Sequence, residues 1–162
     1  MLEHEPECRQ SLLFCLELTI ILTVNFLFFC VKIFFTFYFQ LFTCSLLRYA
    51  LGIDNDEWCY ENALENIDQN HVLGKVDFRL TEIGNIAEHD FDLLLTNIQK
   101  DVLLLIAKDI STKVKEGGIF ILSGLLYTDE TDIVECYTKL GLAFTDKMQL
   151  DEWISLVFKK LS

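Results

Sequence analysis

The sequence predicts an α/β domain with a doubly wound, mostly parallel sheet over residues 48–162, closed by an antiparallel pair of strands. Three observations lead to this prediction. Strand-like segments alternate with helix-like ones, as in "YALGID" followed by "DEWCYENALENIDQN". The runs "DFDLLLTNI" and "IFILSGLL" are continuously apolar, which is typical of strands buried on both faces. The chain ends in "LAFTDKMQL" and "EWISLVFKK", which predict two strands joined by a tight turn.

The first strand–helix unit of this region is clearly marked. An apolar strand over 49–53 ends on Asp54. The following helix has one apolar face, formed by Trp58, Leu64 and Ile67. Asp56 and Glu57 lie in its first turn, where carboxylates interact favourably with the helix dipole. The segment "KVDFRLT" then alternates in character, as expected for a short strand.

Two further helices are predicted between the later strands. The segment "DVLLLIAKDISTKVKEGG" predicts one helix, ended by Gly117 and Gly118. Its inward face comprises Val102, Ile106, Ile110 and Val114. The segment "DETDIVECYTKLG" predicts another helix, ended by Gly141.

Residues 19–47 differ in composition from the rest of the chain. They contain more than half of the 14 phenylalanines, no glycine or proline, and one charged residue, Lys32. The stretch is longer than the roughly 20 residues that a membrane-spanning helix needs. A buried hairpin or helix pair is the alternative to a membrane span.

Charge and cysteine spacing exclude some classes of function. The chain has 13 basic and 25 acidic residues, a formal net charge of −12, which argues against direct nucleic-acid binding and is compatible with a basic protein partner. The six cysteines form no C-x-x-C pair and no repeated spacing. We therefore expect no metal site and free thiols in a reducing compartment.

Polar residues follow several of the predicted strands at the edge where such sheets bind ligands. Asp54 directly ends a strand, and its two carboxylate oxygens could accept hydrogen bonds from both hydroxyls of a ribose; the alternative is a helix N-cap. Asn97, in "TNIQ", could orient an amine, with an N-cap again as the alternative. Thr81 or Glu82, in "LTEIGNI", could flank an adenine. Asp56 is interpreted as a capping residue.

Other catalytic motifs are missing from the sequence. Ser123, in "LSGLL", lacks the G-x-S-x-G elbow of a serine hydrolase. The chain also contains no P-loop.

The segments "ALGIDNDEWCYENALENI", "FDLLLTNI", "VKEGGIFILSGLL" and "DEWISLVFKK", in this order, resemble the class I S-adenosylmethionine-dependent methyltransferases, a Rossmann-like fold. More narrowly, they are similar to the PrmA family, which methylates amino groups of large-subunit ribosomal protein number eleven. The resemblance covers 48–160. "EHEPECRQSLLFCLEL" resembles that family's Gly-Thr-Gly-x-His-Glu segment and following helix, starting after the glycines.

The resemblance implies a cofactor, a partner and site residues. Asp54 would hold the ribose of S-adenosylmethionine, and Asn97 would lie beside the methyl group and position the incoming amine. The partner would be a basic ribosomal protein and the location cytoplasmic. Transfer would be an in-line displacement by a neutral amine, so that catalysis depends mainly on positioning and desolvation.

The departures from the family define three parts of the chain. Residues 1–18 are interpreted as a remnant of the family's N-terminal segment and helix, 19–47 as an atypical segment, and 48–162 as the methyltransferase-like domain. The family's Asp-x-Gly-x-Gly loop belongs before the strand at Tyr49, where this sequence has phenylalanine and leucine. Only glycine lets the backbone approach a cofactor closely in such a loop.

These departures predict a truncated and impaired methyltransferase. One hypothesis is that 19–47 is translated out of frame. Sequencing of the coding DNA tests it, and the hypothesis is rejected if no neighbouring frame spells the glycine loop. The alternatives are a membrane-anchored, methyltransferase-like binding module without catalysis, and a novel hairpin packed on the sheet that still binds cofactor weakly.

Overall fold

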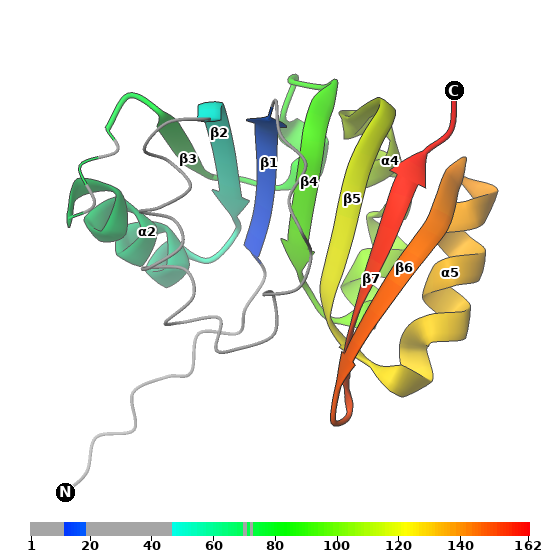
Figure 1. Ribbon diagram of the computed structural model, residues 1–162. Helices are drawn as coiled ribbons and strands as arrows, with labels where there is room; N and C mark the ends of the chain where they lie inside the picture. Colours follow the sequence, from blue (N-terminus) through cyan, green and yellow to red (C-terminus); the bar gives the residue numbers. More distant parts are fainter. Residues whose placement is uncertain (1–11, 19–46, 70, 72) are drawn as a thin grey trace, which may run out of the picture.

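The computed structural model describes residues 12–18, 47–69, 71 and 73–162, and these form one sheet with helices on both faces (Figure 1). The seven strands lie in the order β3-β2-β1-β4-β5-β7-β6. Their bounds are β1 Leu12–Leu18, β2 Leu47–Asp54, β3 Val76–Leu80, β4 Phe91–Asn97, β5 Val114–Leu126, β6 Leu142–Leu150 and β7 Trp153–Lys160. The helices are α2 Glu57–Gln69, α3 Lys100–Leu105, α4 Ala107–Lys113 and α5 Glu130–Lys139, with short 3-10 turns at Ile83–Asn85 and Tyr127–Asp129.

The pairing of the strands confirms the predicted fold class. Strand β2 is parallel to β3, and β4 is parallel to β5. Strand β7 is antiparallel to both β5 and β6, which is the predicted closing hairpin. Successive residues of β2 point to opposite faces: Leu51 joins the large core under α3, α4 and α5, whereas Ala50 packs on the α2 side.

The central strand is where the structure corrects the sequence analysis. The helix predicted within 1–18 is wrong for its described part, because Leu12–Leu18 forms β1. This strand is antiparallel to both neighbours, with Leu13 opposite Ile53 on one side and Thr96 on the other. The reason is that β2 and β4 each need a hydrogen-bonded neighbour inside the sheet, and a helix cannot complete their ladders. Strand β1 therefore belongs to the same sheet as the methyltransferase-like segment.

The predictions for residues 19–47 fall almost entirely outside the described residues. Of that segment, the structure describes only Leu47, the first residue of β2. Across the described ranges, no helix is long and apolar enough to cross a membrane.

The helix predicted up to Gly117 is shorter and divided. It breaks at Ile106 into α3 and α4, and the chain is already extended at Val114, which pairs with Phe91 of β4. Gly118 is needed for this early strand start, because a Cβ at this position would lie 2.8 Å from a Val114 methyl group and 3.0 Å from the Phe91 carbonyl oxygen. The two glycines thus bend a strand instead of ending a helix.

The largest core cluster lies between the sheet and α3–α5. Phe120, Tyr137 and Phe158 are fully buried there, with ring centroids 5.3–6.4 Å apart. The Tyr137 hydroxyl donates a 2.9 Å hydrogen bond to the Leu103 carbonyl, and burial raises the pKa of this hydroxyl. This cluster fixes α3 and α5 against the strands that carry Asn97 and Ser123.

Candidate active site at the carboxyl ends of the strands

Asp54 lies at the carboxyl end of β2, as predicted, and is 3% exposed. Its Oδ1 accepts a 2.9 Å hydrogen bond from the Asp56 backbone N–H. Its own carbonyl accepts a 2.8 Å bond from the Thr81 N–H, which joins the ends of β2 and β3. A buried carboxylate is thereby held rigidly at the edge of the sheet.

The N-cap of α2 is Asp56, and this decides between the two interpretations of Asp54, a ribose ligand or a helix cap. The Asp56 Oδ1 accepts a 3.1 Å hydrogen bond from the Cys59 N–H, in the first turn of the helix. The prediction that Asp56 is a capping residue is confirmed, and Asp54 is not the cap of this helix.

Asn97 ends β4 and is half-buried. The N-cap of the next helix, α3, is Gln99, so the alternative reading of Asn97 as that cap is wrong. Asn97 lies opposite Ser123 of β5, and the Ile98 N–H donates a 3.1 Å bond to the Ser123 carbonyl. Asn97 therefore does not cap α3.

Ser123 and Gly124 support Asn97, and the sequence analysis missed this role. The Ser123 hydroxyl donates a 2.7 Å hydrogen bond to the Thr96 carbonyl and lies 3.4 Å from Asn97 Oδ1. Its single hydrogen serves mainly the shorter bond. Gly124 has φ +79°, and a Cβ there would lie 2.9 Å from Asn97 Oδ1. Only the order of "TNI" and "LSG" at the ends of two neighbouring parallel strands could have indicated this contact.

Asp54 and Asn97 lie level with each other on one face of the sheet. Leu13 of β1 is opposite both Ile53 and Thr96, so the next residue of each strand lies at the same height. Ile53 faces the large core, so Asp54 and Asn97 project from the opposite face, the α2 side. The two backbones are separated by two strand spacings, about 9–10 Å.

The described part of the site fits a ribose better than it fits the remainder of S-adenosylmethionine. Asp54 supplies a buried carboxylate at a strand end, which suits two ribose hydroxyls. The family's glycine loop has no counterpart before β2, because the first glycine of the sequence is Gly52. The direction of β1 adds a second obstacle. Its carboxyl end, Leu18, lies at the edge opposite to Asp54, so the chain that follows β1 leaves from the wrong end of the sheet.

Thr81 directly follows β3 and is half-buried, and Glu82 beside it is exposed. The Thr81 backbone is tied to Asp54, so its side chain starts from the same edge. Its role beside an adenine stays a prediction.

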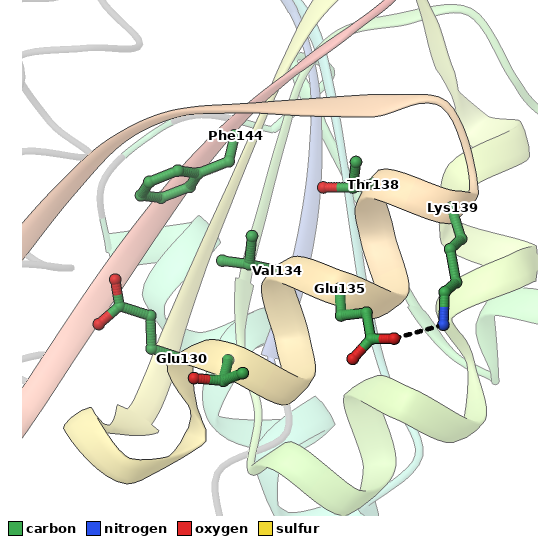
Figure 2. Close-up of a pocket in the computed structure, with 7 residues that line it drawn as sticks. Glu130, Val134, Glu135, Thr138, Lys139 and Phe144 are labelled. Carbon is green, nitrogen blue, oxygen red and sulfur yellow. Dashed lines mark hydrogen bonds and ion pairs between the residues drawn. The ribbon is translucent and has the colours of Figure 1, made fainter.

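A hollow among the described residues lies elsewhere. It has a volume of about 630 Å³, and it lies between α5 and β6, where Figure 2 shows Phe144 above Val134 and an ion pair between Lys139 and Glu135. None of the predicted site residues lines it. We therefore do not assign the active site to this groove.

Cysteine and metal predictions can be compared with the described part of the chain. Cys136 has a free thiol, but Cys59 is disulfide-bonded, so the expectation of free thiols is wrong at that position. Disulfide pairing depends on proximity in space, which spacing along the chain does not reveal. Over the described ranges, no group of three histidine, cysteine or acidic side chains could hold a metal ion.

Comparisons of solved structures support the fold. A ribosomal protein L11 methylase from Lactobacillus delbrueckii subsp. bulgaricus matches with a TM-score of 0.63 at 22% identity, covering 69% of this chain and 58% of that one. A tRNA m1G37 methyltransferase from M. jannaschii matches with a TM-score of 0.58 at 18% identity, covering 69% of this chain and 37% of that one.

Curated relatives agree in their names. A protein named ribosomal protein L11 methyltransferase from Desulfotalea psychrophila is 33% identical over 68% of this chain and 37% of its own length. A protein of the same name from Thermotoga neapolitana is 34% identical over 69% of this chain and 42% of its own length. The chain thus spans little more than a third of the length of these relatives. The family model described as Ribosomal protein L11 methyltransferase (PrmA) matches residues 47–161, so this chain belongs to the PrmA family.

Proposed function

We propose that the chain is part of an S-adenosylmethionine-dependent methyltransferase for amino groups of ribosomal protein L11, and that its own cofactor site is impaired. The observation that carries the proposal is the position of Asp54 and Asn97, level with each other on one face of the sheet on either side of β1. Membership of the PrmA family gives the reaction class.

Asp54 would bind the ribose of the cofactor. Its Oδ1 already accepts a hydrogen bond from the Asp56 N–H, which holds the carboxylate at the end of β2. An ionised carboxylate has lone pairs for several donors, so both ribose hydroxyls can be accepted. The cofactor, when bound, supplies an electrophilic methyl group on a sulfonium.

Asn97 would orient the amine that receives the methyl group. Its Oδ1 can accept a hydrogen bond from an amine N–H, which directs the nitrogen lone pair away from the amide. A carboxamide does not take up the proton, so Asn97 acts by positioning. A free lysine has a pKa of about 10.4, so the site must select the neutral amine.

The impairment follows from the absence of the family's glycine loop. Without it, close backbone contact with the methionine part of the cofactor is lost, whereas the ribose contact at Asp54 remains. We therefore expect weak binding that depends on Asp54.

Calorimetric titration with S-adenosylmethionine tests this proposal. The wild-type chain should bind with a dissociation constant near 1 mM, about −4 kcal/mol, and Asp54→Asn should abolish the signal. Asp56→Asn is the matched control, because it changes a neighbouring acid that caps the helix and keeps a capping side chain. Binding of equal strength in the wild-type chain and Asp54→Asn would contradict the proposal, as would no binding at several millimolar.

A further inference from the structure

The turn between β6 and β7 carries an exposed apolar surface. Four large side chains there are between 38% and 56% exposed: Leu126, Tyr127, Leu150 and Trp153. They are neighbours, because Trp153 pairs with Leu126 of β5 and with Leu150 of β6, and the Tyr127 N–H donates a 2.9 Å bond to the Glu152 carbonyl. With the turn residues Asp151 and Glu152, we call this set the hairpin-tip surface.

The hairpin-tip surface lies at the same edge of the sheet as Asn97. Strands β4 and β5 are parallel and both end there, and Figure 1 shows the β6–β7 hairpin projecting beyond their ends. Trp153 and Asn97 are separated by two strand spacings across the sheet and about three residues along it. This geometry places their backbones on the order of 14 Å apart.

The apolar part also shares the face of the sheet from which Asn97 projects. Leu125 and Ile154 are paired and face the large core, so the next pair, Leu126 and Trp153, points to the opposite face. Leu122 likewise faces that core, so Ser123 and its partner Asn97 point away from it. A chain lying across Trp153 can therefore continue toward Asn97 without crossing the sheet.

The charge around this surface is negative. Asp151, with φ 52°, and Glu152 are exposed at the turn, and neither side chain takes part in an ion pair with another described residue. The nearby lysines are engaged: Lys100 pairs with Asp129, and Lys147 with Glu130. The uncompensated charge at the tip is thus acidic, which favours a cationic partner.

We propose that the hairpin-tip surface docks a basic, extended segment of the substrate protein, with an apolar residue of that segment on Trp153 and its cations on Asp151 and Glu152. This inference rests on the proposed function, which places the accepting amine at Asn97. At about 3.3 Å per extended residue, the docked apolar residue lies about four residues from the methylated one. A second copy of this chain, with its net charge of −12, is disfavoured as the occupant.

Tryptophan fluorescence tests the docking surface, because the chain has two tryptophans, Trp58 and Trp153. Trp58→Phe leaves Trp153 as the reporter, and Trp153→Phe leaves Trp58 on α2 as its matched control. The probe is a synthetic, tryptophan-free peptide with four lysines and one leucine. Docking should shift the emission of Trp153 to the blue and reduce its quenching by acrylamide, with no change at Trp58. No change in the emission or in the acrylamide quenching of Trp153 would overturn the proposal.

Charge variants test the acidic part. Asp151→Asn with Glu152→Gln keeps the turn, because asparagine tolerates the left-handed backbone, and should weaken peptide binding about five-fold at low salt. The control, Glu61→Gln with Asp68→Asn on α2, removes the same charge from exposed positions and should leave binding unchanged. Equal weakening in both would overturn the proposal in favour of a general field effect. Trp153-dependent dimerisation in sedimentation would overturn it in favour of a second copy.

The same samples separate this inference from the proposed function. If Trp153 reports the peptide but S-adenosylmethionine does not bind, the docking surface is supported and the proposed function fails. If the cofactor binds through Asp54 while Trp153 stays silent, the docking surface is wrong and the proposed function stands.

Discussion

The two flanks of the sheet differ in how completely the described residues build them. On the flank of β5, β7 and β6, an aromatic cluster of Phe120, Tyr137 and Phe158 is fully buried under α5. On the flank of β2 and β3, the corresponding cluster under α2 contains only Ile67 and Phe78 as buried residues. The flank of β5, β7 and β6, which borders the strand that ends on Asn97, is therefore packed on a larger buried core than the flank that carries Asp54.

This difference also separates the surroundings of Asn97 from those of Asp54. Asn97, Ser123 and Gly124 are held by contacts between β4 and β5, both inside the matched region. Asp54 also lies in that region, but its neighbour β1 comes from residues outside it and runs antiparallel. Asp54 and Asn97 therefore lie level on either side of β1, and the sequence contains no glycine before β2.

The largest expected effect distinguishes the two cores. Phe120→Ala removes a fully buried ring at the centre of the aromatic cluster and should lower the free energy of unfolding by about 3–5 kcal/mol. Phe78→Ala should lower it less, because fewer buried residues surround that ring. Urea denaturation followed by circular dichroism measures both, and an equal loss would contradict the comparison.

A smaller effect tests the support of Asn97. Gly124→Ala forces an alanine into φ +79° and into contact with Asn97 Oδ1, whereas Gly74→Ala meets the same backbone strain, at φ +86°, with nothing within 4 Å. We expect about 1–2 kcal/mol of destabilisation at Gly74 and about 1–2 kcal/mol more at Gly124. Equal values from the same denaturation experiment would show that Gly124 makes no close approach.

A stabilising change is expected at Thr96, the residue before Asn97. The Thr96 hydroxyl is buried and has no hydrogen-bond partner among the described residues. Thr96→Val keeps the shape and removes the unsatisfied group, which should raise the free energy of unfolding by about 1 kcal/mol. Thr112→Val is the control, because that exposed hydroxyl donates a 2.7 Å bond to the Asp109 carbonyl. A loss of stability in Thr96→Val would show that the hydroxyl is satisfied.

The smallest effect concerns an ion pair on the β3 flank. Hydrogen bonding from Arg79 lowers the pKa of Glu88 in the folded chain. The pair therefore adds stability above the unfolded pKa of about 4.3, and this contribution is lost as the pH falls through the lower folded value. Glu88→Gln should be slightly less stable than wild type at pH 7 and equal to it at pH 2. A stability difference that persists at pH 2 would exclude this linkage.

The sequence predicted what local pattern determines. The strand that ends on Asp54, the cap at Asp56, the buried run before Asn97 and the closing hairpin all follow from periodicity and polar residues at element ends. These features depend on residues close together in the chain, so composition and spacing reveal them.

The remaining features depend on partners distant in the sequence. Leu12–Leu18 is a strand because β2 and β4 require a neighbour, which its own apolar pattern does not distinguish from a helix. Val114 leaves the helix because it pairs with Phe91, and Gly124 matters because it meets Asn97. Register across the sheet decides all three.

Methyl transfer to ribosomal protein L11 tests the central claim most directly. The chain, methyl-labelled S-adenosylmethionine and purified ribosomal protein L11 are incubated, and labelled amino groups are quantified by mass spectrometry beside the Thermotoga neapolitana relative. We predict transfer about 1,000-fold slower than the relative's, equivalent to about 4 kcal/mol, and its loss in Asn97→Ala. Transfer at the relative's rate, transfer that survives in Asn97→Ala, or no label in the wild-type chain would contradict the account.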